Sequence, residues 1–105
     1  MTDKIVVFST CETPEEASRI ARALVEAKLA ACVNIVSGVE SIYRWKGGIE
    51  SSAEVMLVVK TRRHLFARVQ ALIESTHSYE LPECIAVPVV EGSERYLRWL
   101  DEGLS

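Results

Sequence analysis

CVNIVSGVESIYRWKGGIESSAEVMLVVKT, residues 32–61, is the stretch that decides the fold. Its first arm, Cys32 to Trp45, mixes β-branched, aromatic and polar residues without a helical stripe, which predicts an extended strand. The second arm, Ile49 to Thr61, begins polar and becomes apolar at Val55 to Val59, which predicts a strand buried at its far end. Lys46-Gly47-Gly48 lies between the arms, and its two glycines supply the positive φ angles of a tight hairpin turn.

The first arm is too long for a compact domain of this size. At about 3.3 Å per residue it would reach roughly 45 to 50 Å, whereas the radius of gyration of such a domain is about 13 Å. Gly38 is expected to mark a β-bulge that bends the arm. Because the tip still projects and an unpaired strand edge favours association, we expect a homo-oligomer built on this hairpin.

The composition predicts one ordered domain over residues 1–105, with 49% hydrophobic and 26% charged residues. No basic run extends beyond Arg62-Arg63, so a nucleic-acid partner is not expected. The apolar run Ile5 to Phe8 is too short for a signal peptide or a membrane span, which favours a cytoplasmic protein without membrane association. The three cysteines form no Cys-x-x-Cys pair, so we expect neither a disulfide framework nor a structural zinc site.

Five further elements are predicted around the hairpin: strands at Ile5 to Ser9 and Cys84 to Val90, and helices near Thr13, Leu65 and Ser93. Thr13-Pro14-Glu15-Glu16 combines an N-cap residue, a first-turn proline and the glutamate of a capping box. Pro88 cannot donate to a ladder, which places its strand at an edge or a bulge. In the last helix, Tyr96 and Trp99 are expected to be core residues.

The order β-α-β-β-α-β-α predicts an α+β fold, a ferredoxin-like split βαβ sandwich with an extended hairpin and a C-terminal helix. Its strands do not alternate apolar and polar residues at Ile5 to Phe8, Val55 to Val59 and Ile85 to Val90. Both faces of the sheet therefore need cover. The helices supply one cover, and we expect a neighbouring subunit to supply the other.

Several spaced motifs resemble one family, namely Ala31 to Ile35, Ser41 to Gly47, Glu54 to Thr61, His77 to Glu80, Pro82-Glu83 and Tyr96-Leu97 with Trp99. Over essentially its whole length the chain resembles CutA, the divalent-cation tolerance proteins. The resemblance implies a homotrimer, similar in architecture to the PII signalling proteins and associated with tolerance to copper and other divalent metals. The family usually has His-Pro-Tyr-Glu where this chain has His77-Ser78-Tyr79-Glu80, and losing the proline is expected to loosen this loop.

His77 with Glu80 is the first metal-ligand candidate, because imidazole and carboxylate suit divalent ions and one loop presents both. The alternative is that both residues only hydrogen-bond the loop to a neighbour. Cys11 precedes a helix N-terminus, where a stabilised thiolate would hold Cu(I), and the alternative is a small, partly buried residue. Cys32 and Cys84 are expected in the core.

A small-molecule cleft between subunits is predicted from Lys60, Tyr79 and Trp45, with Glu80 beside them. Lys60 would contact an anion and the aromatic rings would stack; the alternative is an interface core with one salt bridge. The sequence has no phosphate loop, nucleophile elbow or recognisable Ser, His and Asp set, and Glu54 has no visible catalytic partner. No enzymatic activity is expected.

The predicted function is a homotrimeric divalent-metal tolerance and binding protein, with copper as the first candidate ion and no required cofactor. The alternative is a PII-like trimeric sensor or adaptor that binds a small anionic ligand at the subunit interface. Neither the sequence nor the resemblance identifies a protein partner.

Overall fold

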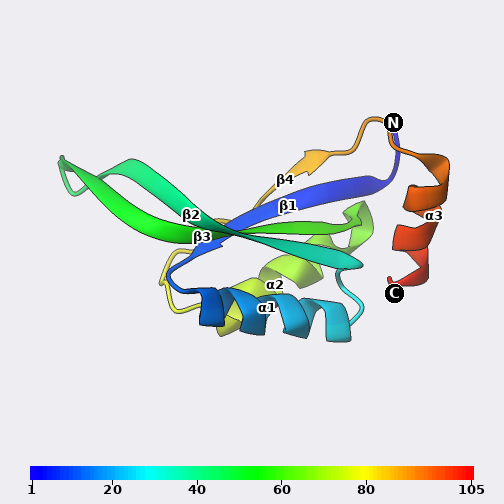
Figure 1. Cartoon of the computed structure of the whole chain (residues 1–105), viewed down its shortest axis with the longest axis horizontal. Coiled ribbons are helices and arrows are strands. Elements are labelled where there is room, and N and C mark those ends of the chain that lie inside the picture. The colour runs from blue at the N-terminus through cyan, green and yellow to red at the C-terminus, as the bar shows by residue number, and fades with distance from the viewer.

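The chain folds into one antiparallel four-stranded sheet with two helices on the same face and a third helix at one end (Figure 1). The structure is a computed structural model and describes residues 1–105. In chain order the elements are β1 (Lys4–Cys11), α1 (Pro14–Glu26), β2 (Cys32–Trp45), β3 (Gly48–Arg62), the 3-10 turn η1 (Arg63–Leu65), α2 (Phe66–Thr76), β4 (Ile85–Pro88) and α3 (Glu94–Glu102). The strand order β2-β3-β1-β4 confirms the ferredoxin-like split βαβ arrangement.

The strand β4 lies at the sheet edge, as the proline predicted, but it is shorter than expected. It pairs with β1 from Ile5↔Pro88 to Phe8↔Ile85 and covers only Ile85–Pro88. Because Pro88 has no N–H, regular pairing ends there, although Val89 still donates to the Lys4 carbonyl at 3.0 Å.

The β2–β3 hairpin projects from the globule (Figure 1), and the molecule measures 45 × 26 × 23 Å along its principal axes. Its register shifts between Val36 and Val39, and Gly38 has a φ of 77°, which confirms the predicted bulge. The turn differs in one detail from the prediction. Its positive φ angles lie at Lys46 (49°) and Gly47 (82°), whereas Gly48 is the first residue of β3 and pairs with Trp45. A two-residue turn with both φ angles positive matches the twist of the strands.

We expect Gly47→Val to lower the free energy of unfolding by about 1 to 2 kcal/mol, because a branched residue is strained at positive φ. A Cβ at Gly47 would meet nothing within 4 Å, so the cost comes from the backbone alone. Gly48→Val is the matched control, since its Cβ would make only an ordinary contact of 3.9 Å with the Trp45 carbonyl oxygen. Chemical denaturation of both variants tests this, and equal effects would contradict the turn assignment.

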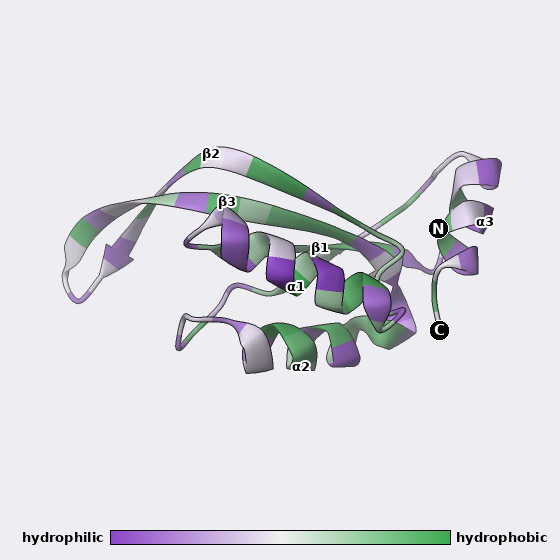
Figure 2. Cartoon of the chain, turned by 60° about the horizontal axis from the view of Figure 1, so that its bottom comes forward, coloured by the Kyte–Doolittle hydropathy of each residue, from purple (hydrophilic) through white to green (hydrophobic).

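The core lies between the sheet and the helices α1 and α2, which lie side by side on one face of the sheet (Figure 2). Its fully buried side chains include Val7, Ile20, Leu24, Leu57, Val59, Leu65, Val69 and Ile73. Burial alternates along β3, because Val55, Leu57 and Val59 are buried while Met56 and Val58 are only half-buried. The opposite face of the sheet is therefore apolar but is not covered by the two helices.

The helix α3 turns a different face inward from the one expected. Leu100 is buried, whereas the stacked rings of Tyr96 and Trp99, 5.6 Å apart, are exposed. Asp101 fixes the helix to the sheet through Lys4 Nζ at 2.9 Å and Arg62 at 2.7 Å. Tyr96 and Trp99 lie three residues apart, and so do Leu97 and Leu100, so helical spacing alone does not decide which side chains face inward. Packing against the sheet buries Leu100 and leaves the two rings exposed.

Candidate functional site

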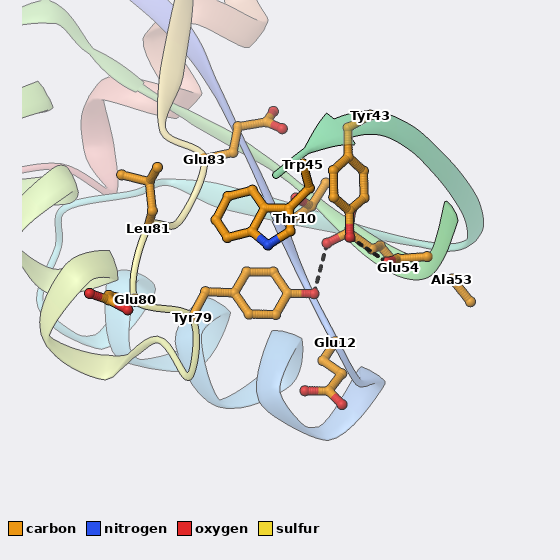
Figure 3. Close-up of a pocket in the computed structure, with 11 residues that line it drawn as sticks. Thr10, Glu12, Tyr43, Trp45, Ala53, Glu54, Tyr79, Glu80, Leu81 and Glu83 are labelled. Atoms are coloured by element: carbon orange, nitrogen blue, oxygen red, sulfur yellow. Dashed lines mark hydrogen bonds between the residues drawn. The ribbon is translucent and has the colours of Figure 1, made fainter. Parts of the chain in front are cut away.

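A cavity of about 1040 Å³ opens beneath the hairpin, between its strands, the end of β1 and the loop that follows α2 (Figure 3). Its lining residues are Thr10, Glu12, Tyr43, Trp45, Ser52, Ala53, Glu54, Tyr79, Glu80, Leu81 and Glu83. Four of them are glutamates, three are aromatic, and none is lysine, arginine or histidine. We call this cavity the acidic cleft.

One hydrogen bond joins the two sides of the acidic cleft. The Tyr79 hydroxyl, which extends from the loop toward β3 in Figure 3, donates to Glu54 Oε2 at 2.8 Å. Burial raises the pKa of Tyr79, and the hydrogen bond to the Glu54 carboxylate raises it further. The phenol therefore stays protonated and neutral, and its ring is held in the cleft wall.

His77 anchors this loop to the sheet and has no free nitrogen. Its side chain is fully buried, its Nε2 lies 2.7 Å from the Thr10 carbonyl oxygen, and its Nδ1 lies 3.0 Å from the Tyr79 backbone nitrogen. Because an N–H only donates and a carbonyl only accepts, Nδ1 is the acceptor and Nε2 carries the proton. The 3.7 Å separation between Nδ1 and Glu16 is too long for a hydrogen bond. In this arrangement neither ring nitrogen of His77 is free, whereas a metal ligand needs an unprotonated free nitrogen. The metal-ligand role of His77 stays a prediction, which this geometry disfavours.

Glu16 holds the same loop from the side of α1. Thr13 caps the helix as predicted, accepting from the Glu16 backbone N–H at 3.1 Å. The Glu16 carboxylate is buried and accepts from the Ser78 N–H at 2.6 Å and from the Ser78 hydroxyl at 3.0 Å. Burial alone would raise the pKa of Glu16, but hydrogen bonds to the carboxylate, above all those from Ser78, together with the nearby His77 outweigh burial and lower it. Ser78 offers the loop two hydrogen-bond donors that a proline lacks.

The cysteines do not offer a soft-metal site in this structure. Cys11 is buried in the core, and its thiol donates to the Thr13 carbonyl at 3.5 Å. Burial, assisted by the Glu16 charge, raises the pKa of Cys11 to about 11, the opposite of the predicted thiolate stabilisation. Cys84 is half-buried against the core, whereas Cys32 is half-buried and precedes the core-packed Val33, which places it on the other sheet face.

Within one chain, Lys60 does not share the acidic cleft with Tyr79 and Trp45. The predicted cleft lies between subunits, so its use of Lys60 stays a prediction. Lys60 lies six residues along β3 from Glu54, or roughly 20 Å at the usual strand rise. Its Nζ sits 5.7 Å from the centre of the Tyr96 ring, at the opposite end of the sheet. Trp45, Tyr79 and Glu80 do line one cavity together.

Among the charged and aromatic residues that line the acidic cleft, the sequence analysis did not single out Tyr43, Glu12 and Glu83. The predicted topology alone could have indicated Glu12 and Glu83, because the end of the first strand and the loop after the second long helix meet at the same end of the sheet. No three His, Cys, Asp or Glu side chains come together in an arrangement that would hold a metal ion. None of the helices is long and apolar enough to cross a membrane.

Comparisons with known proteins agree in sequence and in structure. The family model described as CutA1 divalent ion tolerance protein matches residues 5–103. The divalent-cation tolerance protein CutA of Thermus thermophilus is 47% identical over 97 residues, which cover 92% of this chain and 94% of that protein. A chloroplastic CutA protein of Arabidopsis thaliana is 44% identical over 96 residues, 91% of this chain, yet the chain spans only 53% of that relative's length. The crystal structure of CutA from Xylella fastidiosa has a TM-score of 0.96 at 38% identity, covering 99% of this chain and 100% of that chain.

Proposed function

The chain belongs to the CutA1 divalent ion tolerance family, and from this premise we propose that it serves tolerance to divalent cations as a homotrimer that binds these ions. The observation that carries the proposal is the acidic cleft, in which four glutamates meet no cationic side chain. Such a cleft concentrates cations by its field alone. Copper is the first candidate ion, since it leads the divalent series in affinity for most ligand sets.

The hairpin supports the trimer. Ile42 and Ile49, on its two strands, are 67% and 65% exposed, and the outer edge of β2 has no partner strand. Exposed apolar residues along an open strand edge favour pairing with another chain. The uncovered sheet face, with Val87 44% and Ile85 57% exposed, supplies further apolar surface for the neighbours.

Within the cleft, Glu80 is the one predicted ligand that is accessible, since it is exposed and lines the cavity. His77 and Cys11 are engaged in other bonds, as described above. Carboxylate oxygens that do not converge bind ions weakly and leave them hydrated, so we expect affinities in the micromolar range or weaker. The alternative of a small anionic ligand is less well supported, because Lys60 lies outside this cleft.

The test is a calorimetric titration of the assembled protein with Cu(II) and with Zn(II). We expect the double substitution Glu80→Gln and Glu54→Gln to lower the affinity for both ions by at least about fivefold, or ~1 kcal/mol, because it removes two charges from the cleft. The matched control is Glu26→Gln with Glu102→Gln, which removes the same charge from two exposed helix positions. Equal weakening by both double variants would reduce the effect to net charge and would refute a site in the cleft.

Assembly is tested in the same preparations by light scattering, where we expect the mass of three chains. A monomer mass at micromolar concentration would refute the trimer. A cytoplasmic location and a role without catalysis remain part of the proposal, although the Arabidopsis relative is named as chloroplastic.

A further inference from the structure

We propose that the acidic cleft binds linear organic polycations, in which ammonium groups are separated by methylene segments, as in a polyamine. This goes beyond the tolerance to metal ions proposed above and assigns the same cleft a second class of ligand. The argument depends on how the charges are spread, on the aromatic walls and on the shape of the cavity.

The carboxylates of the cleft are spread out and do not converge. Glu12 follows β1, Glu54 belongs to β3, and Glu80 and Glu83 lie on the loop after α2 (Figure 3). No three of them gather around one point in an arrangement that would hold a metal ion. A point charge therefore satisfies few of these carboxylates at once, whereas a chain with several ammonium groups can meet them one by one.

The aromatic rings match the rest of such a ligand. Trp45, Tyr43 and Tyr79 line the cavity together with the aliphatic Leu81. The face of an aromatic ring attracts an organic ammonium group, and it also packs against methylene segments. A hydrated metal ion gains nothing from these walls. Tyr79 is fixed in place by its hydrogen bond to Glu54 and by its contact with the buried His77 ring, 4.7 Å away, so this wall is formed before a ligand arrives.

The cavity is large, and it is lined from both strands of the hairpin, from the end of β1 and from the loop after α2. Its volume of about 1040 Å³ lies at the upper end of the range for small-molecule sites and far exceeds the volume of one hydrated ion. A cavity of this volume has room for an extended polycation.

The test uses Trp45 as a reporter in the assembled protein. The chain has two tryptophans, so Trp99→Phe leaves Trp45 alone in the cleft wall. We expect spermidine to change the Trp45 emission and, by calorimetry, to bind at least about tenfold more tightly than Mg²⁺. Triethylene glycol, an uncharged chain of similar length, should neither bind nor change the emission.

Substitutions then locate the site. Glu12→Gln with Glu83→Gln should lower the affinity for spermidine by at least about fivefold, and Trp45→Leu should lower it by about threefold, both measured by calorimetry. Glu26→Gln with Glu102→Gln is again the control of equal charge and should leave the affinity unchanged.

Three results would overturn the proposal: Mg²⁺ binding as tightly as spermidine, triethylene glycol binding equally well, or an unchanged Trp45 emission at saturating spermidine. The metal proposal is judged separately. Loss of copper binding in the cleft variants without any spermidine binding would leave tolerance to metals standing and refute the polycation site. Spermidine binding without copper binding would support the polycation site and refute metal binding in the cleft.

Discussion

His77→Ala is expected to lower the free energy of unfolding by about 3 kcal/mol, because it removes a fully buried ring together with two hydrogen bonds. The Thr10 carbonyl loses its donor, the Tyr79 N–H loses its acceptor, and the ring leaves a cavity beside Tyr79. Chemical denaturation at constant protein concentration measures this change.

His64→Ala is the matched control, since it is the same substitution at the other histidine of the chain, which is exposed in η1. We expect an effect within about 0.5 kcal/mol. If His77→Ala were as stable as wild type yet no longer bound copper, the structural role would be refuted and the ligand interpretation would return.

Glu16→Ala is the second large effect, with an expected loss of about 2 to 3 kcal/mol at pH 7. The substitution removes a buried carboxylate that accepts two hydrogen bonds from Ser78, and bonds to a charged group are the stronger kind. Glu15→Ala, at the exposed neighbouring position of the first turn of α1, is the control and should cost much less.

The pH dependence of this contribution has a definite sign. The pKa of Glu16 is lower in the folded chain than its ordinary value of 4.5, so the unfolded state binds the proton more tightly. The stabilisation is therefore complete above about pH 4.5 to 5 and is lost as the pH falls through the folded pKa. Glutamine carries no titrating carboxylate, so Glu16→Gln lacks this stabilisation at every pH. The stability difference between wild type and Glu16→Gln should therefore shrink on acidification below pH 4.5. A difference that stays constant from pH 7 down to about pH 3 would contradict the role of this carboxylate.

The position of Ser78 makes the same network testable from the other side. Ser78→Ala removes the hydroxyl donor but keeps the N–H donor, so we expect it to lower the free energy of unfolding by only part of the loss caused by Glu16→Ala. In the double variant the two losses should not add, since both residues belong to one network.

Local patterns alone determined the elements of this fold and their order. The capped helix at Thr13, the bulge at Gly38 and the edge strand at Pro88 each depend on the conformational limits of one or two residues, which act wherever the chain lies. The resemblance added the family, and the comparisons confirmed it.

Only the tertiary structure decided which polar side chains meet. Local spacing suggested that His77 and Glu80 face one ion, but burial directed His77 to Thr10 and left Glu80 in the cleft. Lys60 belongs to the same strand as Glu54, yet the strand carries the two residues to opposite ends of the sheet.

The helix dipole argument for Cys11 failed for a similar reason, since burial in the core outweighs the effect of the nearby helix N-terminus. Backbone preferences are set by near neighbours in the sequence, and the sequence therefore determines the elements. The protonation, burial and partners of a side chain depend on residues distant in the sequence, which only the folded sheet brings together.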